Sequence, residues 1–84
     1  MKNISIVITI RQCTESRDVE VCGACEKEYN PLALYAFAGD VIQKAKACGG
    51  VLIPWVKEQL YQHFCYVFRF ETEEGKREFL KNLV

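Results

Sequence analysis

The feature that most restricts the fold is a run of alternating aromatic residues near the C-terminus. Between residues 64 and 71 every second side chain is a large ring, and the side chains between them are smaller or charged. The rings are Phe64, Tyr66, Phe68 and Phe70. A period of two places them on one face of a β-strand, where rings of this size need a covering layer. The segment predicts a half-buried strand whose aromatic face belongs to the core.

A second alternating segment lies at the N-terminus, where Ile4, Ile6, Ile8 and Ile10 share one face of a predicted strand. A polar turn over 14–18 follows. The alternation at 19–21 then predicts a short strand that folds back as a hairpin and ends at Cys22.

Two helices are expected from their end signals. Asn30 and Pro31 are a favoured pair at a helix start, and Gly49-Gly50 stops the helix that they begin. Thr72 begins a final helix with acidic residues in its first turn. The predicted buried positions of the two helices are Leu34, Phe37, Ala38, Val41, Ala45 and Cys48 in the first, and Phe79, Leu80 and Leu83 in the second.

The segment 51–61 permits two interpretations. Pro54 fits the first turn of a short helix, with Val56, Leu60 and Phe64 on one side, and it equally fits an interruption in an edge strand running from Val51 to Val56.

The order of these elements predicts an α+β fold. We expect a small mixed or antiparallel sheet of three to four strands with two to three helices on one face, a pattern typical of ferredoxin-like or split βαβ arrangements. With 84 residues, the chain is expected to form a single domain, 1–84. Such a small domain buries only about 60% of its unfolded surface, so its core must be used efficiently.

Charge and hydropathy narrow the function classes. Eleven basic residues balance eleven acidic ones, so no overall field attracts nucleic acid or an anionic membrane. The N-terminal apolar stretch is short, is broken by Ser5 and Thr9, and lacks a cleavage site of small residues. The expected location is therefore intracellular, soluble and cytoplasmic, with no membrane span.

The five cysteines are the main chemical feature, above all Cys22-Gly-Ala-Cys25, which is expected to lie in a turn. As half of a zinc site, the pair would need two further ligands from among Cys13, Cys48, Cys65 and His63. As a redox site it resembles a thioredoxin-type motif, but Glu26 and Glu28 would raise the pKa of a thiolate there. The third interpretation is structural, with a locally cross-linked turn at Cys22 and Cys25 next to the long helix. Cys48 and Cys65 fit small core residues, and they are also the thiols expected near that turn, so all four are candidates for a disulfide or metal site. No cofactor is firmly implied, and zinc stays open.

The aromatic strand also permits an RNA-binding interpretation. Residues 66–70 and the acidic helix start after them resemble the third strand and second helix of an RNA-recognition motif, although the basic-glycine start of that motif is missing. Nucleic acid is therefore not the expected partner.

No short catalytic motif is present in the sequence, so the expected function is a non-enzymatic protein-interaction module, either an adaptor or a regulatory inhibitor. The candidate contact residues are Trp55, Tyr61 and Tyr35. An unpaired edge strand could recruit a protein partner or a second copy of the chain as a homodimer.

Overall fold

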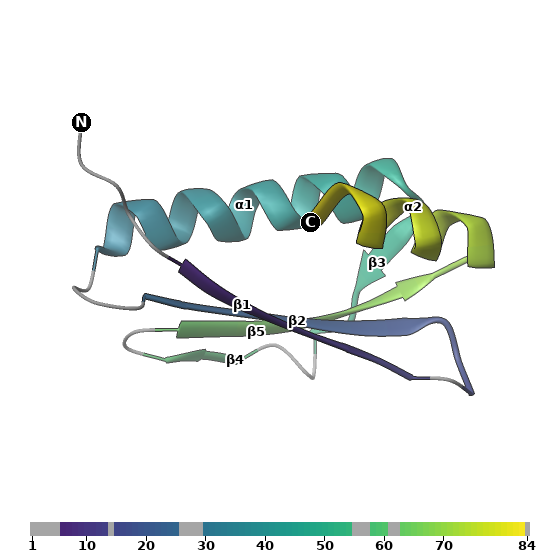
Figure 1. Cartoon of the computed structure of the whole chain (residues 1–84), viewed down its shortest axis with the longest axis horizontal. Helices are drawn as coiled ribbons and strands as arrows, with labels where there is room; N and C mark the ends of the chain where they lie inside the picture. Colours follow the sequence, from purple (N-terminus) through teal and green to yellow (C-terminus); the bar gives the residue numbers. More distant parts are fainter. Residues whose placement is uncertain (1–5, 14, 26–29, 55–57, 61–62, 84) are drawn as a thin grey trace.

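The computed structural model describes residues 6–13, 15–25, 30–54, 58–60 and 63–83. A sheet forms one layer, and both helices cover the same face of it (Figure 1). The elements in chain order are β1 (Ile6–Gln12), β2 (Asp18–Cys25), α1 (Pro31–Ala47), β3 (Gly50–Leu52), β4 (Glu58–Leu60), β5 (His63–Phe70) and α2 (Glu73–Leu83).

The strands lie in the order β1-β2-β5-β3, with β4 also paired to β5, and every pairing is antiparallel. The chain leaves β2, crosses the sheet through α1 and returns as β3, so that β5 lies between the two strands that α1 joins. This is a split βαβ arrangement, and it confirms the predicted α+β class with helices on one face.

Strand β2 is longer than the sequence indicated, and the expectation of a turn around Cys22 and Cys25 is wrong. Both residues lie inside the strand, which pairs with β1 on one side and β5 on the other. Gly23 has a packing role, because a Cβ there would lie only 2.7 Å from the Phe64 ring. The glycine makes room for a core ring and does not mark a turn.

The segment 51–61 contains two short strands on the outer side of β5. Strand β3 pairs with residues 68–70 and β4 with residues 63–65, and the Ile53 N–H donates to the Val67 carbonyl at 2.9 Å. Pro54 lies two residues after the end of β3, outside the ladder, as expected for a residue that has no N–H to donate. Each interpretation therefore holds in part. Residues 50–52 form an edge strand, Pro54 has a 3-10 helical conformation as expected at a helix start, and residues 58–60 form a strand and not a helix. Val56 lies outside the described residues.

Both helix starts follow the predicted capping. The Ala33 N–H donates to Oδ1 of Asn30 at 3.0 Å, and the Gly75 N–H donates to Oγ1 of Thr72 at 3.0 Å. Helix α1 ends where Gly49 takes a φ of 81°, a conformation that favours glycine.

The core lies between the sheet and the helices. Among the described residues, it is built from the aromatic face of β5, two valines of β2 and the inward sides of α1 and α2. Its fully or nearly buried members are Val19, Val21, Leu34, Ala38, Val41, Ala45, Phe64, Tyr66, Phe68, Phe70 and Phe79.

Candidate interaction surfaces

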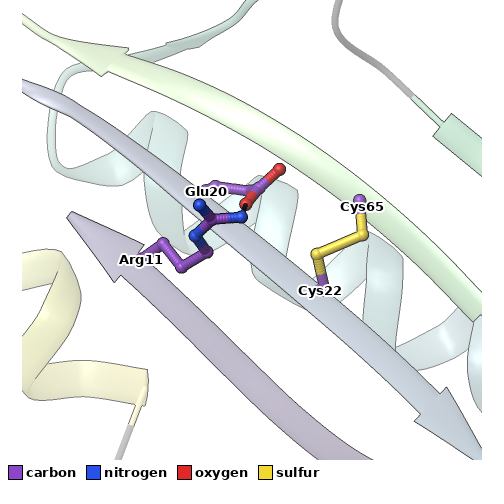
Figure 2. Close-up of a disulfide and its surroundings, with 4 residues drawn as sticks. All are labelled: Arg11, Glu20, Cys22 and Cys65. Atoms are coloured by element: carbon purple, nitrogen blue, oxygen red, sulfur yellow. Dashed lines mark hydrogen bonds and ion pairs between the residues drawn. A yellow bond between two sulfur atoms is a disulfide. The ribbon is translucent and has the colours of Figure 1, made fainter. Parts of the chain in front are cut away.

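A disulfide between Cys22 and Cys65 ties β2 to β5. The two residues face each other in the strand register, with their Cα atoms 4.1 Å apart. This spacing matches a non-hydrogen-bonded antiparallel pair, in which side chains approach most closely. Figure 2 shows the sulfur bridge beside the Arg11–Glu20 pair, with helix α1 behind the strands. The bridge therefore lies on the face of the sheet that the helices do not cover. We call this face the open face.

The other cysteines singled out by the sequence lie elsewhere. Cys25 is three residues after Cys22 in one strand, so the two side chains point to opposite faces, and Cys25 packs against the core. Cys48 caps the end of α1, and both Cys25 and Cys48 are free thiols. The part of the chain that the structure describes contains no group of three His, Cys, Asp or Glu side chains that could hold a metal ion.

Two free thiols differ in acidity. Cys13 is exposed after β1, and a hydrogen bond with the Ser16 side chain, together with one from the Glu15 backbone, lowers the pKa of its thiol. Burial, followed by the charge of Glu78, raises the pKa of the Cys48 thiol. At neutral pH, Cys13 has the larger thiolate fraction of these two.

Ion pairs cross the open face between neighbouring strands. Arg69 donates from Nε to Oδ1 of Asp18 at 2.9 Å and from Nη2 to Oδ2 at 3.1 Å. This hydrogen bonding lowers the pKa of the Asp18 carboxyl. Arg11 pairs with Glu20 at 3.4 Å. Among the described residues, these four charged side chains are paired within the molecule and form no strip of a single sign on this face.

The aromatic row of β5 is turned to the core. Phe64, Tyr66, Phe68 and Phe70 are all buried, and Phe68 meets Phe79 of α2 edge-on with ring centroids 5.6 Å apart. Burial, followed by the electrostatic effect of Tyr35, raises the pKa of the Tyr66 hydroxyl. A base cannot stack on rings that are covered in this way, so these four rings do not offer an RNA-binding surface.

Of the three aromatic residues predicted to contact a partner, Trp55 and Tyr61 lie outside the described residues. Tyr35 lies on α1 and is 61% exposed. Leu32, one helical turn earlier, is 81% exposed, so the two side chains form a small apolar patch on the helix.

A groove of about 710 Å³ lies at one end of the sheet, between the β1–β2 turn and β3. Its walls include Arg17, Asp18, Val51, Pro54, Arg69 and Phe70. Behind the turn, the buried ammonium of Lys76, only 6% exposed as a residue, donates to the carbonyls of Cys13 and Ser16 at 3.3 and 3.4 Å. This contact holds α2 to the turn, a role that no local sequence signal indicated.

The two edges of the sheet differ. The β3–β4 edge consists of two three-residue strands with Pro54 in between, and short strands and proline are common ways to block an edge. The β1 edge is a continuous seven-residue strand that pairs only with β2 among the described strands. Val7 is 50% exposed on its open side and Ile8 is 36% exposed on its helix side. Within the described part of the chain, strand β1 is thus a largely apolar edge without a second partner strand.

No protein-family model, curated protein sequence or solved structure matches this chain. Neither α1 nor α2 combines the length and the apolar character needed to cross a bilayer, as far as the described residues extend.

Proposed function

We propose that this chain is a small non-enzymatic interaction module that binds a protein partner by strand addition along the outer edge of β1. The observation that carries the proposal is the exposure of Val7 and Ile8 on the two sides of an uninterrupted edge strand. An edge of this kind offers a partner both backbone hydrogen bonds and apolar contacts.

The direction of the backbone groups supports this use. The Cys13 N–H donates to the Asp18 carbonyl at 3.2 Å, in register with the β1–β2 ladder. Because backbone groups alternate along an antiparallel strand, the odd residues of β1 bond to β2 and the even residues point outward. The outward N–H and C=O groups therefore belong to Ile6, Ile8, Ile10 and Gln12.

The competing functions lack comparable support in the geometry. A thiol redox pair at Cys22 and Cys25 would need both sulfurs on one side of the strand, whereas the two side chains lie on opposite faces. A regulatory inhibitor or adaptor needs only an accessible surface, which the β1 edge supplies.

The test is site-specific photo-cross-linking in cell extract, followed by reconstitution. A photoreactive residue replaces Val7 at the β1 edge or, as the matched control, the exposed Arg77 on α2. We expect a cross-linked protein from the Val7 position alone. The purified partner should then bind Ile8→Pro about ten-fold more weakly than the unmodified chain, because proline removes an outward N–H.

Equal cross-linking from Arg77, or unchanged affinity of Ile8→Pro for the purified partner, would overturn the proposal. The ladder with β2 does not use the Ile8 N–H, and proline is tolerated at such edge positions, so this variant is expected to fold. Ile8→Lys provides a second variant that opposes docking through charge.

A further inference from the structure

The β1 edge is also complementary to itself. We infer that the strand which adds to β1 is β1 of a second copy of the chain, in antiparallel orientation about a two-fold axis at Ile8. The inference rests on the proposed function, because it names the partner of the same edge. A two-fold contact uses one surface twice and closes on itself, as in most homo-oligomers.

The backbone permits this pairing. With the axis at Ile8, Ile8 faces its own copy, and Ile6 faces Ile10 of the second copy. These are the residues whose N–H and C=O groups point away from β2. Each facing pair can then exchange two hydrogen bonds, as in a regular antiparallel ladder.

The side chains match in the same register. On the open side, Val7 faces Thr9 of the second copy, which is a pair of β-branched residues suited to cross-strand contact. On the helix side, the isoleucines of the two strands form a continuous row. Ile6 and Ile10 already pack against the core and Ile8 is 36% exposed, so the contact would bury apolar surface at the rim of each core.

Charge does not oppose the contact. No charged residue lies between Ile6 and Ile10, and each Arg11 is paired with Glu20 of its own chain at 3.4 Å. The two copies of Arg11 would lie six residue spacings apart along the seam, which is about 20 Å and roughly twice the Debye length in physiological salt. Repulsion across the axis is therefore small.

The axis is perpendicular to the sheet, since the strands run in opposite directions and keep the same face. Both pairs of helices then lie on one side of a continuous sheet, and the two open faces form one surface on the other. A chain of 84 residues would bury more apolar surface in this way. Small domains need such added stability, which in other cases comes from metals or additional cross-links.

The test measures the mass and dimer affinity of the purified 84-residue chain by native mass spectrometry and sedimentation velocity. A non-reducing denaturing gel excludes dimers joined through free thiols. We expect a non-covalent dimer at concentrations up to about 100 µM. Ile8→Pro and Ile8→Lys should each raise the dimer dissociation constant by about ten-fold or more, whereas Val51→Lys on the opposite edge should not.

Amide hydrogen exchange gives an independent measure. In the dimer, the N–H groups of Ile8 and Ile10 should be protected from exchange, because an outward N–H at a sheet edge is protected only by a partner strand. In Ile8→Lys, the N–H of Ile10 should therefore exchange faster than in the unmodified chain. A monomer at about 100 µM, or a dimer that survives both Ile8 variants, would overturn the inference. If the chain is monomeric but Val7 still cross-links to a different protein with sensitivity to Ile8→Pro, the inference fails while the proposed function stands.

Discussion

The two faces of the sheet are held together by different means. On the helix face, rings from β5 interlock with α2, and Phe68 and Phe70 both pack against Phe79. On the open face, a disulfide and two cross-strand ion pairs connect neighbouring strands. Water competes with polar contacts on the open face, so exposed ion pairs contribute little there and a covalent bond contributes more. The comparison predicts that stability depends on packing on one side and mainly on a single bond on the other.

The largest effect is expected from the helix face. Phe68→Ala should lower the free energy of unfolding by about 3–5 kcal/mol, because it removes a buried ring and leaves a cavity against Phe79. The matched control is Val67→Ala at the preceding residue of β5, whose half-buried side chain points to the open face. This substitution should lower the free energy of unfolding by about 1 kcal/mol. Denaturant unfolding measures both. Equal losses would contradict the comparison.

The next effect concerns the covalent bond of the open face. Cys65→Ser removes a cross-link between residues 43 positions apart and should lower the free energy of unfolding by about 2–4 kcal/mol. Cys13→Ser, at an exposed free thiol, is the control and should change it by less than about 0.5 kcal/mol. Thermal unfolding measures the stability of both variants. Equal stability of Cys65→Ser and Cys13→Ser would show that the disulfide does not stabilise the open face.

A smaller effect tests how β2 makes room for the core. Gly23→Ala should destabilise the protein by about 1–3 kcal/mol, because its Cβ would press on the Phe64 ring. Gly39→Ala is the matched control on α1, where nothing lies within 4 Å of the added Cβ. That change should instead stabilise the helix by about 0.5–1 kcal/mol. Denaturation midpoints that move in the same direction would show that the close approach at Gly23 is unimportant.

The smallest effect belongs to the exposed ion pair. The hydrogen bond from Arg69 lowers the pKa of Asp18, so the pair contributes stability above the unfolded pKa of the carboxyl and loses it as pH falls through the folded pKa. In Arg69→Gln, the Asp18 pKa measured by NMR titration should rise toward its ordinary value. Arg11→Gln, which breaks the other ion pair, should leave it unchanged. The interpretation fails if both variants give the same Asp18 pKa.

The predictions that were confirmed came mostly from the local periodicity of apolar residues. The alternation over 64–70 and the apolar spacing of α1 placed the buried faces correctly, because side-chain direction follows from the two backbone periods alone. Asn30 and Thr72 marked the helix starts for an equally local reason, since each cap accepts a hydrogen bond from an N–H three residues later.

The candidate site depended on contacts that no local pattern contains. Cys22 and Cys65 meet only because β2 and β5 pair in one particular register, whereas the spacing of Cys22 and Cys25 suggested a turn. Gly23 is explained by a ring 41 residues later in the chain, and Lys76 by carbonyls of the β1–β2 turn. Local sequence patterns were sufficient for β1, β5, both helices and their apolar faces, but not for the full length of β2 or for residues 51–61. The neighbours of each strand, the Cys22–Cys65 bridge and the edge position of β1 among the described strands follow from strand pairing, which joins residues far apart in the chain and so leaves no local signal.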